Sequence, residues 1–220
     1  SQQIIAQISE FQERGSGWIF QRVCKLELNV SRYSPLKGSS YIDRPACIAK
    51  REGLINIKNE DQQCFAWCVL ATLHPQYIHP ERVSKYKQYK DELNFDGIKF
   101  PVTVEQIPKF EKQNDISVNV YGLEEISGKQ AEIYPVHISK QIQLKHVNLL
   151  LVVQAENSHY ILIKDFNRFM YNYSKHEHRK HFCYSCLQCF STSKVLASHE
   201  INRRAHKAQT VVMPDANNNI

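Results

Sequence analysis

The segment from Cys64 to Leu73 constrains the fold of this 220-residue chain most strongly, because Thr72 is its only polar residue. When these ten residues are placed on a helix of 3.6 residues per turn, apolar side chains occupy every side. A helix that is apolar all round lies in a protein core, and ten residues are too few for a membrane span, which needs about 20. The segment therefore predicts a central buried helix, with Asn59 or Asp61 as its N-cap.

The segments around this run favour a mixed fold. Three favour helices, the first by apolar residues at helical spacing and the second as an exposed, Lys/Tyr-rich stretch, and five alternate or form short apolar runs in the manner of strands. A core helix followed by closely connected strands is typical of the α+β class, with the helix packed on an antiparallel sheet. The predicted helices are 1–14, 81–95 and 103–113, the last interrupted by Pro108, and the predicted strands are 18–30, 116–121, 133–138, 147–153 and 159–163.

Charge and cysteine content divide the chain into two parts. Residues 171–210 contain seven basic and two acidic residues, which accounts for five of the six net positive charges. The same window holds three of the seven cysteines and five of the ten histidines. We therefore expect a body at 1–170, whose first 50 residues are an N-terminal extension, a basic Cys/His-rich module at 171–210 and a disordered tail at 211–220.

Composition and cysteine content indicate the cellular compartment in which the protein is expected. The chain is 42% hydrophobic and 23% charged, as is typical of a soluble globular protein, and no apolar run approaches the length of a membrane span. The first ten residues lack the pattern of a secretory signal. An odd number of cysteines without a signal indicates thiols or metal ligands in a reducing compartment, so we expect an intracellular protein of the cytoplasm or nucleus with no membrane association.

Cys64 and His159 are candidates for a nucleophile and its general base. Cys64 opens the predicted helix, where the helix dipole favours a thiolate, and His159 begins a strand that could end beside that turn. Asn157 shares a strand face with His159, about 6–7 Å away, and could orient the imidazole. Asp165 has the same parity but lies about 20 Å further along a straight strand, so it could reach the ring only if the strand bends or ends early.

The alternative interpretation of these residues is structural. A cysteine in an apolar helix is usually a packing residue, and a histidine at a strand start is often only a polar end residue. Cys68, one turn deeper in the same helix, provides an internal control and is expected to be inert.

The basic module has the spacing of a zinc finger. Cys183 and Cys186 are followed after twelve residues by His199 and after six more by His206, which suits tetrahedral zinc in a ββα unit. Cys189, His181 and His178 leave the ligand set open, because the interval before His206 exceeds the usual three to five residues. If this module is separate from the body, metal removal is expected to unfold it alone.

A basic finger also raises the possibility of nucleic-acid binding. The stretch before His199 reads STSKVLASH and carries one lysine, whereas Arg203 and Arg204 follow it. Base recognition needs polar or arginine side chains on that helix. We therefore expect a structural or partner-contacting finger, with at most non-specific contact to phosphates.

Four strings in the chain resemble a known group of proteins. They are GSGWIFQRVCKLELNVSRYSPLKGSSYIDRP, INIKNEDQQCFAWCVLATLHP, HYILIKDFNRFM and HFCYSCLQCFSTSKVLASHE. Together they resemble proteins encoded by insect transposable elements of the Polinton/Maverick type, in which such a module precedes a type B DNA polymerase. The module is also similar to eukaryotic deubiquitinases related to the herpesvirus large tegument protein, which are papain-like cysteine peptidases with an early Cys and a late Asp-x-His.

This resemblance implies a deubiquitinase of papain-like α+β fold that cleaves after the C-terminal glycine of ubiquitin through a thioester. It implies Cys64 as nucleophile and His159 as base, with Asn157 where the family has Asp, and no cofactor for catalysis. The oxyanion glutamine of the family has no certain match, and Asn59 is the best candidate. Two other functions stay open: a peptidase that processes the element's own polyprotein, and a non-catalytic nucleic-acid-binding accessory of the polymerase.

Overall fold

The computed structural model describes residues 41–127, 130–154, 157–171 and 180–205, all within one compact unit that begins at Pro35. The predicted helix 1–14 and strand 18–30 lie outside the described residues, as does most of the N-terminal extension. The elements are β1 (Leu54–Ile55), α2 (Cys64–Leu73), the 3-10 turns η1 (Val83–Lys85), η2 (Lys87–Glu92) and η3 (Val104–Gln106), α3 (Ile107–Asn114), β2 (Ile116–Ser127), β3 (Gln130–His137), β4 (Lys145–Gln154), β5 (Asn157–Ile163), α4 (Phe166–Met170), β6 (His181–Phe182), β7 (Cys189–Phe190) and α5 (Ser193–Ala205).

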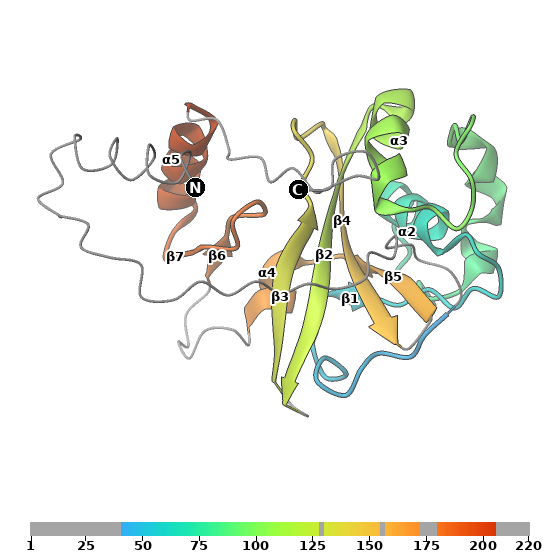
Figure 1. The fold of residues 1–220 in the computed structure, drawn as a ribbon, viewed down its shortest axis with the longest axis horizontal. Helices are drawn as coiled ribbons and strands as arrows, with labels where there is room; N and C mark the ends of the chain where they lie inside the picture. Colours follow the sequence, from blue (N-terminus) through green and yellow to red (C-terminus); the bar gives the residue numbers. More distant parts are fainter. Residues whose placement is uncertain (1–40, 128–129, 155–156, 172–179, 206–220) are drawn as a thin grey trace, which may run out of the picture. The chain divides into compact units, whose positions relative to one another are not determined.

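The α+β class is confirmed, but the expectation of an antiparallel sheet is wrong in part. Five strands pair in the order β1-β5-β4-β2-β3, and β2 and β4 run parallel (Figure 1). The cause is the position of β3, which forms an antiparallel hairpin with β2 at the outer edge of the sheet. The chain then returns to the other side of β2, where β4 takes the direction of β2. The remaining pairs, β4–β5 and β1–β5, are antiparallel.

Helix α2 forms at the predicted residues, and all of its positions from Cys64 to Ala71 are buried. The predicted N-caps are replaced by Gln63, whose backbone N–H donates to Asp61 Oδ1 at 2.9 Å. The Asp61 carboxylate also accepts from the Trp67 indole Nε1 at 3.0 Å, which ties the first turns of the helix to the preceding loop. The helix stops at Leu73, two residues before a proline that cannot continue the hydrogen-bond ladder.

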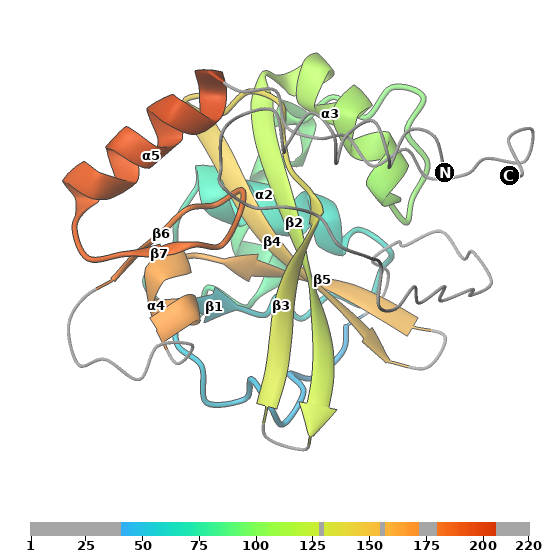
Figure 2. The ribbon, with the colours of Figure 1, turned by 60° about the vertical axis from the view of Figure 1, so that its left-hand side comes forward.

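The sheet separates two hydrophobic clusters, because side chains alternate between its faces. Helix α2 packs over β5 and β4 on one face, and α4 belongs to the cluster on the other face (Figure 2). The side chains of β4 and β5 that face α2 are Leu149, Leu151, Tyr160 and Leu162, and those that face away are Leu150, Val152, Ile161 and Ile163.

Two predicted helices differ from the structure. The Lys/Tyr-rich segment 81–95 forms two short 3-10 turns rather than one exposed helix, because Tyr86 is fully buried and its hydroxyl donates to the Pro80 carbonyl at 2.8 Å. Pro108 does not interrupt a helix. It lies in the first turn of α3, where a missing N–H costs no hydrogen bond.

Candidate catalytic and metal sites

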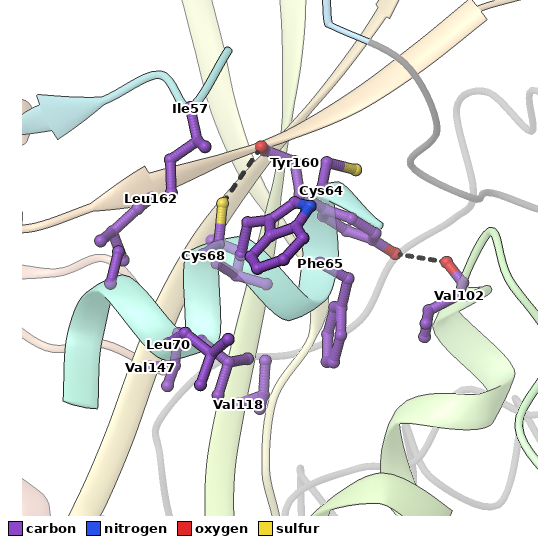
Figure 3. Close-up of a cluster of buried hydrophobic side chains, with 14 of the residues drawn as sticks. Ile57, Cys64, Phe65, Cys68, Leu70, Val102, Val118, Val147, Tyr160 and Leu162 are labelled. Atoms are coloured by element: carbon purple, nitrogen blue, oxygen red, sulfur yellow. Dashed lines mark hydrogen bonds between the residues drawn. The ribbon is translucent and has the colours of Figure 1, made fainter. Parts of the chain in front are cut away.

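Cys64 is the first residue of α2, as predicted, and its side chain is fully buried (Figure 3). Burial raises the pKa of its thiol from 9.0 to about 12, against the opposing effect of a hydrogen bond to the backbone at Tyr160. The nearby Asp61 carboxylate contributes a further, smaller increase in this pKa. The thiol is therefore protonated at neutral pH in this arrangement. The expected thiolate at a helix N-terminus is absent because burial raises the pKa more than the backbone hydrogen bonds lower it.

Cys68 lies one turn further into α2 and is a packing residue in every respect. Its side chain is fully buried, and its thiol donates to the Tyr160 carbonyl at 3.3 Å (Figure 3). Burial raises its pKa well above the ordinary value. Both cysteines thus adjoin the backbone of Tyr160, the residue that follows His159 on β5.

His159 is fully buried on β5, and its Nε2 lies 2.9 Å from Asn56 Oδ1. Asn56 follows β1 and is itself buried, and its Nδ2 donates to the Ile42 carbonyl at 2.9 Å. Because this donation orients the amide, Oδ1 faces the imidazole as an acceptor, and the hydrogen-bond network assigns the proton to Nε2. Nδ1 is then the basic nitrogen of the ring. The Tyr41 ring meets the imidazole edge-on, with 5.7 Å between ring centroids.

Among the described residues, the side chain that contacts a ring nitrogen of His159 is that of Asn56, and neither Asn157 nor Asp165 makes this contact. Asn157 is the exposed first residue of β5, paired with Gln154 where the β4–β5 hairpin closes. Asp165 lies beyond the end of β5 and is the N-cap of α4, where its Oδ1 accepts from the Arg168 N–H at 3.0 Å. Strand parity suggested Asn157 and Asp165. The antiparallel pairing of β1 with β5 instead places Asn56, which directly follows β1, beside the His159 ring.

Cys64 and His159 lie on either side of the β5 backbone. The Tyr160 side chain faces α2. Because side chains alternate along a strand, the His159 side chain, one residue earlier, faces the opposite side of the sheet. The structure shows no hydrogen bond between the Cys64 thiol and the His159 ring, both of which belong to the described residues. The first turn of α2 and the start of β5 are adjacent, as predicted, but the two side chains are not joined.

Asn59 does not occupy the place of an oxyanion donor. It is buried, and its Nδ2 donates to the Asp61 carbonyl and, at 3.1 Å, to Asp61 Oδ1. An oxyanion donor must direct an N–H toward the substrate carbonyl. The Asn59 amide instead donates to Asp61 and stabilises the loop that leads into α2.

A cleft of about 560 Å³ opens beside Asn56 and is lined in part by Tyr41, Arg44, Lys58 and Glu81. A larger cleft of about 790 Å³ lies beside α4 and is lined by residues that include Asp165, but by none of Cys64, His159 and Asn56. The smaller cleft is lined by Asn56, the hydrogen-bond partner of His159, but by neither His159 nor Cys64.

The Cys/His-rich module folds as β6, β7 and α5, and it brings three of the predicted ligands together. The ligand atoms of Cys183, Cys186 and His199 lie within 4.8 Å of one another, with Cys186 Sγ 3.3 Å from His199 Nε2. This group could hold a metal ion. Cys189, on β7, is exposed and is not part of the group, and the predicted fourth ligand, His206, lies outside the described residues.

A tight turn sets the positions of the two cysteines in this group. The Leu187 N–H donates to the Cys183 carbonyl at 2.9 Å, and the Cys183 N–H donates to the Gln188 carbonyl at 3.0 Å. Leu187 has φ of 61°, an uncommon conformation for a non-glycine residue, which lets the chain reverse between β6 and β7. As expected for a small ββα core, the Phe190 ring packs on His199, 4.7 Å between centroids.

Comparisons of the chain with protein-family models, curated proteins and solved structures found no match. Within the described residues, no helix combines the length and the apolar character needed to cross a bilayer. The six cysteines that the structure describes are free thiols.

Proposed function

We propose that the chain is a cysteine peptidase with a papain-like arrangement of Cys64, His159 and Asn56. The observation that carries this proposal is the buried pair of His159 Nε2 and Asn56 Oδ1 at 2.9 Å, on the strand next to the first turn of α2. An amide that holds one imidazole nitrogen fixes the ring and its tautomer, so the other nitrogen can take a proton from a thiol. This is the role of the Asn in Cys-His-Asn peptidases.

The reaction starts from a protonated thiol and a neutral imidazole. Cys64 Sγ bonds to the carbonyl carbon of the scissile amide while its proton passes to His159 Nδ1. The imidazolium gives this proton to the departing amine as the C–N bond breaks, which leaves a thioester on Cys64. Water then loses a proton to the same imidazole and attacks the thioester, releasing the carboxylate and restoring the thiol. The backbone N–H of Cys64, at the helix N-terminus, is the proposed oxyanion donor.

The separation of Cys64 and His159 at rest requires a step before chemistry. Hydrogen bonds between catalytic groups are often long without substrate and tighten only in the bound complex. In this proposal, an acyl chain entering the cleft beside Asn56 opens the packing over the Cys64 thiol and shifts the start of β5, so that His159 Nδ1 reaches the thiol while Asn56 still holds Nε2. The resting enzyme is therefore poorly reactive, and substrate completes the site.

The resemblance to tegument-related deubiquitinases supports ubiquitin as the substrate, with cleavage after its C-terminal glycine. The test is hydrolysis of a fluorogenic amide at the ubiquitin C-terminus, compared with hydrolysis of a peptide library. We expect turnover of the ubiquitin amide that is lost in His159→Ala. Hydrolysis of peptides alone would move the substrate to the polyprotein of a transposable element. A folded chain that hydrolyses neither would refute the peptidase.

A second candidate function is a non-catalytic module in which Cys64 is a core residue. The observation that favours it is the complete burial of the thiol, whose pKa is raised to about 12. In this case Cys64→Ala should bind nucleic acid as the unmodified chain does, and neither should hydrolyse any amide. Salt dependence of binding would identify phosphate contacts through the basic module.

We also propose that the metal held by Cys183, Cys186 and His199 is zinc, with His206 as the fourth ligand. Two thiolates and imidazole nitrogens in a ββα unit are the donor set that tetrahedral zinc prefers. The metal would be structural and would take no part in peptide cleavage. Free cysteines throughout the described residues support an intracellular, reducing compartment. Elemental analysis of the purified chain tests the metal: one zinc per chain is expected, and a metal-free folded module contradicts it.

A further inference from the structure

Tyr184, which lies between the two cysteine ligands, joins the metal-binding module to the body of the protein. Its ring packs edge-on against Phe166 of α4, with 4.9 Å between centroids, and stacks on His146 of β4 at 5.6 Å. Its backbone carbonyl accepts a hydrogen bond from the Tyr121 hydroxyl of β2 at 2.6 Å. The loop that carries the metal ligands is therefore in contact with two central strands and a helix.

Beneath Tyr184 lies a network of buried polar side chains on the sheet. Tyr121 is fully buried, and its hydroxyl also lies 3.2 Å from Asn148 Oδ1. His146 Nε2 lies 3.1 Å from the same oxygen, and its Nδ1 lies 2.8 Å from Ser117 Oγ. The Tyr121 hydroxyl has one proton to donate, and the Tyr184 carbonyl at 2.6 Å is a nearer acceptor than Asn148 Oδ1 at 3.2 Å. Without the Tyr184 carbonyl, the hydroxyl would compete with His146 for the same Asn148 oxygen, so the module completes the network.

A second set of contacts fixes the same module. The Phe182 N–H of β6 donates to Asn167 Oδ1 of α4 at 3.1 Å, and the Phe182 side chain is buried in the core cluster that α4 shares with the sheet. Leu187, in the turn that follows Cys186, packs against this cluster. Phe182 and Leu187, which lie next to Cys183 and Cys186 in the chain, thus attach the module to the body through both polar and apolar contacts.

From these contacts we infer that the metal-binding loop is an intramolecular partner of the sheet, and that the bound metal maintains the order of the sheet face it covers. This inference rests on the proposed metal site but not on the proposed peptidase. A small finger does not keep its fold without its metal. Loss of the metal would release Tyr184 and Phe182 together and would expose the network at Tyr121. Metal removal should therefore loosen the body, contrary to the expectation of two independent parts.

The test uses the full chain and two matched variants, Cys186→Ser and Cys189→Ser. Both cysteines are exposed and belong to the same module, but only Cys186 is in the ligand group. The measurements are zinc content by elemental analysis and amide hydrogen exchange of peptides from β2 and β4. We expect Cys186→Ser to lose zinc and to exchange at least tenfold faster in both strands, and Cys189→Ser to match the unmodified chain.

A third variant, Tyr184→Ala, separates docking from metal binding. It should keep its zinc and still show faster exchange in β2 and β4, because it removes the ring that covers His146. Unchanged exchange in both strands after zinc loss from Cys186→Ser would overturn the inference, even if α5 itself became unprotected. An unmodified chain that contains no metal would overturn it as well. Neither result depends on peptidase activity, so failure of the peptidase would be recognised separately.

Discussion

The Cys64 thiol should react very slowly with small alkylating reagents in the resting chain. Burial raises its pKa from 9.0 to about 12, and each pKa unit reduces the thiolate fraction at neutral pH tenfold. The rise from 9.0 to about 12 lowers the thiolate fraction about a thousandfold, and because a more basic thiolate is a stronger nucleophile, the rate falls by roughly 30- to 60-fold. Full burial restricts access of the reagent and lowers the rate further.

The assay is alkylation by iodoacetamide at pH 7.5, with the mass of each cysteine-containing peptide followed over time. Cys189 is the internal reference, because it is exposed and outside the metal-binding group. Asp61→Asn should speed the reaction of Cys64, since it removes a charge that raises the pKa of the thiol. Trp67→Phe is the control, because it removes a hydrogen bond to Asp61 but keeps the charge. Alkylation of Cys64 within tenfold of Cys189 would refute the argument from burial.

Three further predictions concern other parts of the body. Asn56→Ala should reduce turnover of the ubiquitin amide at least ~100-fold, because His159 loses its orienting partner, whereas Asn157→Ala should leave turnover unchanged; equal effects would contradict the assignment. Burial raises the pKa of Glu111, but the His137 ring 3.5 Å away and the hydrogen bond from the Val118 N–H outweigh it and lower the pKa below 4.5. Glu111→Gln should therefore lower the free energy of unfolding by about 1 kcal/mol at pH 7, and this difference should disappear as acid titration passes through that lowered pKa, as measured by urea unfolding. Phe65→Ala should cost about 3–5 kcal/mol in the same assay, since the ring is fully buried among three aromatic rings, and a cost below about 1 kcal/mol would contradict this packing.

The sequence predicted those elements whose cause is local. The ends of α2 follow from a continuous apolar run with a polar loop before it and a proline shortly after it. The apolar run at the centre of β4 likewise predicts that strand. The segment around Tyr86 was mispredicted because its burial depends on a contact with Pro80 rather than on periodicity. The strand β1 has only two residues, too few for an alternating pattern, so its pairing with β5 was not foreseen.

The orienting residue could not be found by local reasoning for the same reason. Asn56 and His159 are separated by 103 positions in the chain and meet only because β1 pairs with β5. The one available signal was an asparagine between apolar residues shortly before the core helix, in the string LINIKN. Spacing alone pointed to Cys183, Cys186 and His199 as candidate metal ligands, and the structure brings these three residues together in a group that could hold a metal ion. The docking of Tyr184 on the sheet is a tertiary contact that spacing does not encode.

The most direct test of the central claim is covalent capture by ubiquitin that carries an alkyne electrophile in place of its C-terminal carboxylate. Intact-mass measurement should show one adduct, located on Cys64 by peptide mapping. The adduct should persist in Cys68→Ala, since this cysteine is a packing residue in the same helix, and should be lost in Cys64→Ala. A correctly folded, unmodified chain that forms no adduct, or forms it equally well in Cys64→Ala, would contradict the assignment of Cys64 as the nucleophile.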